Sequence, residues 1–138
     1  MRIIENICLL LGRLLLGTYF ILPGLQKISN YQGTTDYMLA HSVPATASLL
    51  PVTIALQIIL GLAIIIGFKG KFAAFILAGL TLVISVYMHD FWSMVEGLAR
   101  THETQNFFKN MGIMAGLLMI SSIGTGWLSL DNRIANNS

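Results

Sequence analysis

Charged side chains are scarce in this chain. Asp, Glu, Lys and Arg make up 10% of its 138 residues and hydrophobic residues 55%, whereas a typical soluble domain carries about 25% charged residues. A soluble domain of this length could not bury so much apolar surface, and the mean hydropathy of +0.75 indicates that lipid is its natural solvent. The formal net charge of +2 is too small to support nucleic-acid binding.

Cysteine is almost absent as well. The single Cys8 excludes an intrachain disulfide, so any dithiol chemistry would have to come from a partner. The sequence also lacks a nucleotide-binding glycine loop, a haem ligand pair within the apolar runs, and a nucleophile with an evident base. If the chain takes part in a reaction, we expect it to be at most a subunit of a larger complex.

Long apolar runs are what the sequence has in abundance. Four of them, at about residues 7–25, 49–68, 72–88 and 107–123, approach the roughly 20 residues with which an α-helix crosses a bilayer. Arg13 interrupts the first run and no cleavage signal follows, so we interpret this run as a retained helix and not as a signal peptide. The sequence predicts an all-α integral membrane protein, with one domain over residues 1–138 folded as a four-transmembrane-helix bundle.

The connections between these runs are unequal. Residues 68–71 form a tight basic turn, whereas residues 28–48 and 89–106 form two long polar loops, which we expect to fold back as short interfacial segments. Lys69 and Lys71 favour a cytoplasmic position for the short turn under the positive-inside rule. We therefore expect a multi-pass protein of a bacterial inner membrane, with both termini cytoplasmic and both long loops on the outer face.

Arg13 is the most unusual residue of the first predicted helix. A charge within the hydrocarbon region costs roughly 2.5–3.5 kcal/mol on insertion scales, so this guanidinium must have a partner or a purpose. Three roles remain open: extension toward the cytoplasmic headgroups, pairing with Asp131 beyond the fourth helix, or contact with a ligand. They differ in whether the guanidinium faces the interior of the bundle.

One polar residue from each predicted helix falls at a similar depth near the outer leaflet: Lys27, Gln57, His89 and Asn110. Such convergence is expected of a ligand pocket or a proton route, and the alternative is interhelical hydrogen bonding that fixes the bundle. The neutral amides of Gln57 and Asn110 suit a carbonyl or hydroxyl ligand. Together with Arg13, these four are the predicted ligand-binding residues, and no catalytic residue is assigned.

All three histidines fall on the outer face beside acidic residues: His41, His89 and His102 with Asp90, Glu96 and Glu103. Imidazole and carboxylate suit divalent transition metals. Their spacing matches no metal-ligand motif, so we expect no metal site and favour solvated histidines or one histidine that donates a proton.

Several short segments, in their order and spacing, resemble a known family. They are Gly12-Arg13, Phe20, Gly24 and Lys27 in the first helix, Tyr37-Met38, His41 and Val43-Pro44 in the first loop, Gly61-Leu62 and Gly67 in the second helix, His89-Asp90-Phe91-Trp92 in the second loop, Lys109-Asn110 and Ala115-Gly116-Leu117-Leu118 in the fourth helix, and residues 124–131 at the C-terminal end. Over nearly its whole length the chain resembles the DoxX family of small four-helix bacterial membrane proteins.

The resemblance implies a place beside redox chemistry. The family takes its name from a relative of the membrane subunits of thiosulfate:quinone oxidoreductase. Other members are associated with membrane redox complexes and thiol-stress responses, and many have no assigned activity. Members often carry an acidic residue in the second helix where this chain has Gln57, which argues against proton transfer at that position.

Two functional hypotheses compete at this point. The leading one is a redox-linked membrane subunit that holds a quinone or a similar apolar ligand near the outer leaflet and receives electrons from a soluble or membrane partner protein. The alternative is a non-enzymatic module that binds lipid or a small solute, or that serves as a scaffold. A homo-oligomer is compatible with both, and a metal-handling role is the third hypothesis.

Overall fold

The computed structural model describes residues 2–137, and the regular structure over that range is helical throughout. Its elements are α1 (Arg2–Ser29), α2 (Tyr31–Ala40), α3 (Thr46–Ile66), α4 (Gly70–Met88), the short 3-10 helix η1 (Phe91–Ser93), α5 (Leu98–Ile123) and α6 (Leu130–Asn137). The segments Ile3–Ser29, Thr46–Ile66 and Gly70–Ser93 are long and apolar enough to cross a membrane. The predicted all-α membrane fold is confirmed.

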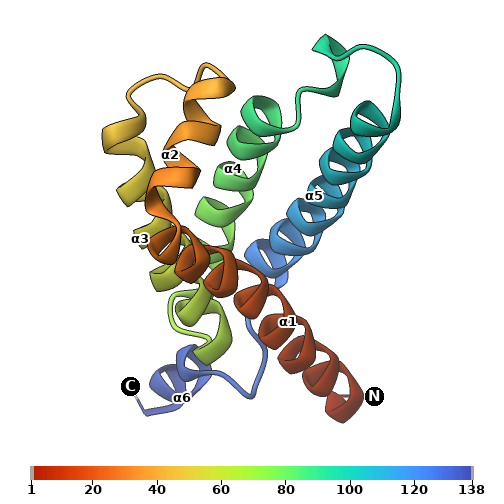
Figure 1. Cartoon of the computed structure of the whole chain (residues 1–138). Coiled ribbons are helices and arrows are strands. Elements are labelled where there is room, and N and C mark those ends of the chain that lie inside the picture. Colours follow the sequence, from red (N-terminus) through yellow and green to blue (C-terminus); the bar gives the residue numbers. More distant parts are fainter. Residues whose placement is uncertain (1, 138) are drawn as a thin grey trace.

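The fourth predicted span belongs to α5, which is 26 residues long but is not among the segments that qualify by hydropathy. Its first turns, residues 98–106, are polar, and Lys109 and Asn110 follow soon after. α5 nevertheless packs along α4 for much of its length (Figure 1). A crossing by α5 therefore stays a prediction.

Most helices extend beyond the apolar runs that predicted them. α1 continues to Ser29 instead of stopping near residue 25, and α5 begins at Leu98 instead of near residue 107. A helix satisfies its backbone hydrogen bonds internally, so it continues through polar residues until a stop signal appears. For α3 that signal is Gly67, whose positive φ of 70° closes the helix while its N–H bonds back to Ile64 O at 3.2 Å.

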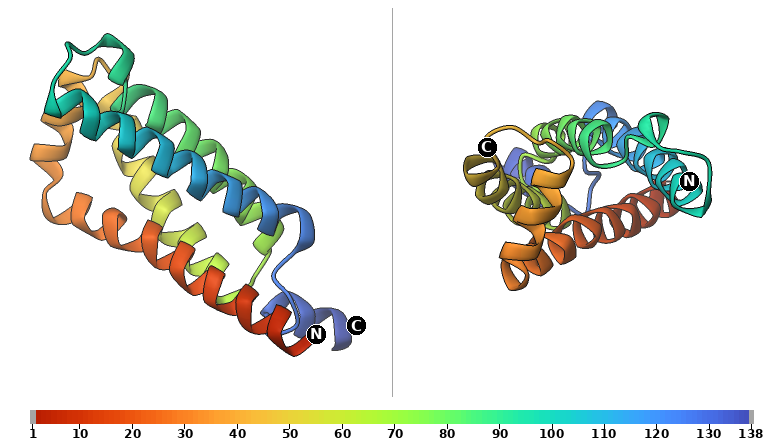
Figure 2. Two further views of the ribbon diagram at one scale, coloured as in Figure 1. Left: turned by 90° about the vertical axis from the view of Figure 1, so that its right-hand side faces the viewer. Right: turned by 45° about the horizontal axis from the view of Figure 1, so that its top comes forward.

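The helices are arranged so that the two ends of the bundle differ. Figures 1 and 2 show both termini and α6 at one end, which we call the terminal end, and α2 and η1 at the opposite end, the loop end. The long connections are thus partly helical: residues 28–48 contain α2, and residues 89–106 contain η1 and the first turns of α5. The side chain of Arg2, which adds to the predicted basic charge at the terminal end, lies outside what the structure describes.

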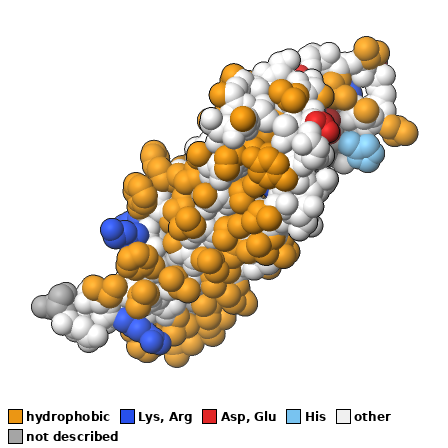
Figure 3. Space-filling view, turned by 60° about the vertical axis from the view of Figure 1, so that its left-hand side comes forward, with side chains coloured by type: hydrophobic (Ala, Val, Ile, Leu, Met, Phe, Trp, Pro, Cys, Tyr) orange, Lys and Arg blue, Asp and Glu red, His pale blue; other side chains and the backbone are white. Residues whose placement is uncertain are grey.

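The outer surface of the bundle is apolar. Large side chains such as Leu15 and Phe75 expose 74% and 61% of their area, which a water-soluble domain would avoid but a lipid-facing helix requires. Figure 3 shows the resulting apolar band on one face, with basic side chains toward one end and acidic and histidine side chains toward the other.

The interior holds two apolar clusters. The larger, centred on Phe20, Ile64, Leu77 and Leu117, joins α1, α3, α4 and α5. The smaller lies toward the loop end and consists of Met38, Val43, Leu50 and Ile54, with Met88 packed against it. It fastens α2 and the following loop onto α3, so the loop end has a core of its own.

Candidate functional site

A cavity of about 1060 Å³ lies at the loop end between α1, α2, α3 and α4. We call it the loop-end pocket. α3 and α4 are joined by a short turn at the terminal end and diverge toward the loop end (Figure 1), while α2 lies alongside the start of α3. The side chains there do not fill the widening space, and a cavity results. It is lined mostly by apolar residues such as Leu50, Leu56 and Ile84.

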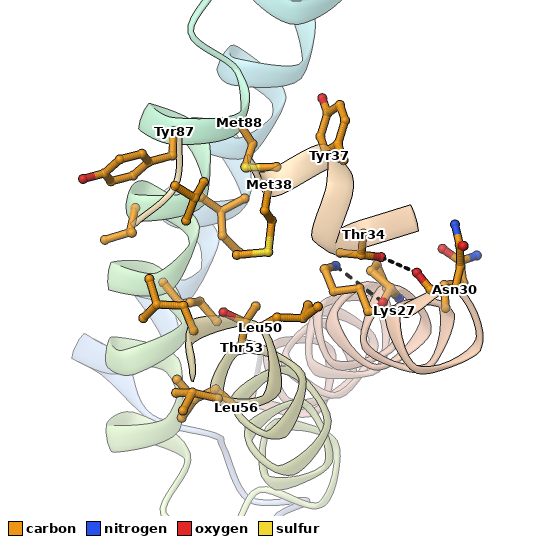
Figure 4. Close-up of a pocket in the computed structure, with 18 of the residues that line it drawn as sticks. Lys27, Asn30, Thr34, Tyr37, Met38, Leu50, Thr53, Leu56, Tyr87 and Met88 are labelled. Carbon is orange, nitrogen blue, oxygen red and sulfur yellow. Dashed lines mark hydrogen bonds between the residues drawn. The ribbon is translucent and has the colours of Figure 1, made fainter. Parts of the chain in front are cut away.

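Polar groups enter this pocket mainly from α1 and α2. Lys27, Thr34 and Tyr37 lie on that side, and Thr53 faces them from α3 (Figure 4). Lys27 Nζ donates a long hydrogen bond of 3.4 Å to Pro23 O and makes no ion pair with any residue from 2 to 137. An ammonium with so little compensation on an apolar wall favours a ligand that can accept hydrogen bonds.

The pocket opens sideways between α3 and α4. Val52 and Val83 line it and yet are 52% and 55% exposed, and Leu49 and Tyr87 on the same two helices are also exposed. These four side chains thus line the cavity and also reach the exposed surface of α3 and α4. With α3 and α4 in a membrane as predicted, an apolar molecule could enter the cavity between them from the lipid.

Two histidine–carboxylate pairs fasten the loop end above the pocket. His41 Nδ1 lies 3.3 Å from Asp90 Oδ1, which ties the loop after α2 to the loop after α4. His89 Nδ1 lies 2.6 Å from Glu103 Oε2, which ties the end of α4 to the start of α5. Among residues 2–137 no group of three or more His, Cys, Asp or Glu converges to hold a metal ion.

Tyr37 connects these pairs with the pocket that it lines. Its ring packs on His41 with a centroid separation of 4.6 Å. Partial burial, together with the nearby carboxylates of Glu103 and Asp90, raises the pKa of the Tyr37 phenol above its usual range. The phenol therefore stays protonated at neutral pH, and Figure 4 shows its hydroxyl directed away from Lys27 and Thr53.

The five predicted ligand-binding residues do not form one group. Lys27 and His89 both line the loop-end pocket. Asn110 is buried elsewhere, where its side chain accepts a hydrogen bond from Tyr19 (3.0 Å) and donates one to Ser85 Oγ (3.1 Å). It thereby joins α1, α4 and α5, which matches the alternative of hydrogen bonds that fix the bundle.

Gln57 is also buried outside the pocket, on the side of α3 that faces α1. Its Cβ lies 3.3 Å from the position that a side chain on Gly24 would occupy. Only 5% of Gln57 is exposed, and its Oε1 has no hydrogen-bond partner within the described part of the chain. The amide thus lies between two helices, with one acceptor still to be satisfied.

Arg13 lies at the terminal end, with its guanidinium turned into the bundle and only 1% of the residue exposed. It donates hydrogen bonds to three backbone carbonyls: Thr125 O at 2.6 Å, Leu128 O at 2.8 Å and Ile65 O at 3.0 Å. These acceptors belong to the end of α3 and to the connection between α5 and α6. Arg13 therefore ties three segments together, far from the loop-end pocket.

Asp131, which was one of the alternatives considered for Arg13, forms hydrogen bonds with backbone amides. Its carboxylate accepts hydrogen bonds from Lys69 N at 2.7 Å and Gly70 N at 2.9 Å. A carboxylate at a helix N-terminus satisfies free amides and suits the positive end of the helix dipole. Asp131 thus caps α4 from a distant part of the sequence.

Sequence reasoning missed the contribution of α2 to the site. Tyr37 and Met38 line the pocket but entered the sequence argument only as part of a family resemblance. Thr53 was not singled out, because one threonine in an apolar run carries no signal of its own. The Ser85–Asn110 contact had a faint signal in Thr81 and Ser85, which are four residues apart and so share a face of α4.

Comparison with known proteins agrees with this architecture. The DoxX family model matches residues 8–90. The chain is 35% identical over 134 residues to the inner membrane protein YqjF of Escherichia coli, with 97% of each chain covered, and 28% identical over 127 residues to the inner membrane protein YphA of the same organism, with 92% of this chain and 90% of that protein covered.

A more distant match is partial. The chain is 32% identical over 76 residues to a Surfeit locus protein 4 homolog of Drosophila melanogaster, which covers 54% of this chain and 28% of that protein. No solved structure matches significantly. The family model spans more than half of the chain, and the similarity to YqjF runs nearly from end to end. This membrane protein therefore belongs to the DoxX family.

Proposed function

We propose that this protein is a redox-linked membrane subunit that holds one quinone-like molecule in the loop-end pocket. The observation that carries the proposal is a cavity with apolar walls that reaches the exposed surface of α3 and α4 and contains the ammonium of Lys27, which makes no ion pair within residues 2–137. Its volume of about 1060 Å³ is near the top of the range of small-molecule sites, about 300–1,000 Å³. A ring with an isoprenoid tail needs such a space and such an entrance.

The polar groups of the pocket suit a head that accepts hydrogen bonds. Lys27 and Thr53 can each donate, and no Asp or Glu side chain is found among the described residues that line the cavity. A quinone ring offers two carbonyl oxygens as acceptors and no charge. Met38 and Met88 (Figure 4) add soft apolar surface, which packs well against a flat ring.

The second candidate is a binder of an anionic lipid-like molecule such as a fatty acid. It is favoured by the same Lys27, since an ammonium without a carboxylate partner would attract a carboxylate more strongly than a neutral carbonyl. The two candidates share the cavity and differ in the charge of the head, so Lys27 discriminates between them.

The proposed orientation places the loop end on the outer side of the inner membrane. Lys69, Lys71 and Arg133 gather at the terminal end, and basic residues in short loops favour the cytoplasm. A redox partner would then reach the pocket from the outer side or within the membrane.

A fluorescent-protein fusion to the C-terminus should be bright, whereas a fused alkaline phosphatase, which folds only outside the cytoplasm, should be inactive. The reverse pattern would invert the orientation.

Extraction of the purified protein tests the pocket. We expect mass spectrometry of the extract to find about one quinone per chain, and Thr53→Trp to abolish its retention, because the indole fills the cavity. Thr18→Trp is the matched control, since Thr18 is exposed on α1 and lies outside the pocket. Equal retention by both variants, or a wild-type extract with no bound amphipath, would contradict the proposal.

Lys27→Met then identifies the class of head. A neutral quinone loses one hydrogen-bond donor, so its affinity should fall by roughly tenfold. An anionic ligand loses its counter-charge and should not be retained at all. If Lys27→Met retains wild-type amounts of any ligand, the polar end of the site is not at Lys27.

A further inference from the structure

A second hollow, of about 900 Å³, lies at the terminal end, opposite the loop-end pocket. It is formed by the start of α4 together with the connection between α5 and α6, residues 124–129. We call it the lysine hollow, after Lys69 and Lys71, which line it together with Phe72 and Trp127. None of these residues takes part in the function proposed above.

The hollow carries a net positive charge, because two lysines and one carboxylate, that of Asp131, are among the residues that line it. Asp131 uses both oxygens to accept backbone N–H groups of Lys69 and Gly70, and none of the ion pairs found within residues 2–137 involves either lysine ammonium. The amides at the start of α4 are thus capped, so the helix end is closed to another anion. What remains for an anion is the pair of lysine side chains.

Lys71 is held in place within the hollow. Its Nζ donates a 2.9 Å hydrogen bond to Ser122 O at the end of α5. Its stem passes over Gly124, where an added Cβ would lie 3.2 Å from Lys71 Cε and where φ is +93°. A glycine there permits both the turn and the close approach of the lysine. Two of the three ammonium hydrogens stay available for a ligand.

Lys69 occupies an unfavourable backbone position. Its φ of 45° is in the left-handed region, which glycine or asparagine adopts at a lower conformational cost than lysine. Its ammonium lies 5.9 Å from the centre of the Phe68 ring. This placement keeps a second cation beside the hollow at some cost in conformational energy.

The surroundings of the hollow match the boundary between lipid and water. Trp127 and Phe72 are 65% and 62% exposed, and indole rings settle at the level of lipid headgroups. Ile123, 63% exposed, continues the apolar surface along α5. Figure 3 shows basic side chains near one end of the apolar band. A lipid bound there would place its headgroup beside the basic side chains and its acyl chains along the apolar band.

We propose that the lysine hollow binds the phosphate of an anionic phospholipid, with Lys69 and Lys71 on the headgroup and the acyl chains along Phe72 and Ile123. Basic pockets between membrane helices on the cytoplasmic side bind the head groups of anionic lipids. Free inorganic phosphate offers the same charged group without the chains. The contacts with Phe72 and Ile123 favour the lipid, and the experiment separates the two sources.

Trp127 provides a reporter inside the hollow. The chain has two tryptophans, so a Trp92→Phe background leaves Trp127 alone. In phosphatidylcholine vesicles that contain equal fractions of brominated phosphatidylglycerol or brominated phosphatidylcholine, we expect the anionic lipid to quench Trp127 more strongly, with a selectivity of roughly fivefold per lysine. Lys69→Gln combined with Lys71→Gln should reduce this selectivity to none.

The control removes two positive charges at the other end of the bundle, through Arg100→Gln with Lys109→Gln, and should keep the selectivity. Inorganic phosphate at constant ionic strength should not change the quenching. Selectivity that survives in the double lysine variant, or that phosphate abolishes, would overturn the lipid site. Should the double variant fail to fold, Lys71→Gln alone must lower the selectivity severalfold, and an unchanged value would count against the proposal.

Discussion

Replacing Arg13 with methionine is expected to lower the melting temperature of the detergent-solubilised protein by about 10 °C. The variant leaves three carbonyl oxygens, those of Ile65, Thr125 and Leu128, without their donor. Each such loss costs about 1–3 kcal/mol, and removal of a buried cation recovers part of that cost. A net loss of roughly 3 kcal/mol corresponds to the stated shift for a chain of this length.

In Arg13→Met, the loss of stability should be largest near the three carbonyl acceptors. The carbonyls of Thr125 and Leu128 belong to the connection between α5 and α6, so amide hydrogen exchange in residues 124–129 should accelerate by far more than exchange around the loop-end pocket. Arg13→Lys should lie between wild type and Arg13→Met, because an ammonium keeps the charge but lacks the planar fork that reaches three acceptors. Ligand retention in the pocket should survive wherever the variant stays folded.

Leu14→Met is the matched control for this experiment, since Leu14 is the next residue of α1 and is exposed to lipid. It should melt within about 2 °C of wild type, as expected for an exposed position. If Arg13→Met melted as late as this control, the guanidinium would not join the three segments, and extension toward the headgroups would become the better description of Arg13.

The long apolar helices were predictable from the sequence, because hydrophobicity alone determines them. Runs of about 20 apolar residues mark helices that cross a bilayer, and α1, α3 and α4 follow from that rule. The short turn at Lys69 followed from the break between two such runs. α2 was not predictable as a helix, because residues 31–40 are neither apolar throughout nor clearly periodic; its place is fixed by Met38, which packs against Leu50 and Val43.

The sequence predicted the site from depth along the helices, and the structure divides the predicted residues between different places. Counting 1.5 Å per residue predicted similar heights for Gln57, Asn110, Lys27 and His89, whereas Asn110 bonds to Tyr19, about two turns of α1 before Lys27. Each residue along a helix also turns the side chain by about 100°, and which face meets which neighbour depends on tertiary packing. Lys27 and His89 turn into the pocket, whereas Gln57 and Asn110 turn into helix contacts. The rotations are set by interhelical contacts that no single stretch of sequence contains.

Gly61→Val tests the contact that sets one of those rotations, between α1 and α3. A Cβ at Gly61 would lie 3.0 Å from Gly17 O and 2.9 Å from Ile21 Cγ1, and a Cβ at Gly17 would lie 2.6 Å from Gly61 O. The side chain of Ile21 can move aside, but the backbone carbonyl of Gly17 cannot. Close approach of two helices through facing glycines is a common way to pack helices in lipid.

We expect Gly61→Val to lower the melting temperature by about 10 °C, since overpacking of a tight contact costs roughly 1–3 kcal/mol or more. It should also weaken ligand retention, because displacing α1 from α3 moves Lys27 relative to Thr53 across the loop-end pocket. Gly61→Ala should show a smaller loss, since its single methyl group meets the same carbonyl without the added branches of valine.

Gly79→Val is the matched control. Gly79 is exposed in the middle of α4, and a Cβ there would meet nothing within 4 Å, so the substitution removes a flexible residue from a helix without creating a clash. It should leave the melting temperature unchanged or slightly raised. Equal melting temperatures for Gly61→Val and Gly79→Val would mean that α1 and α3 are not in contact at this level. The loop-end pocket, whose shape depends on the spacing of these helices, would then be incorrect.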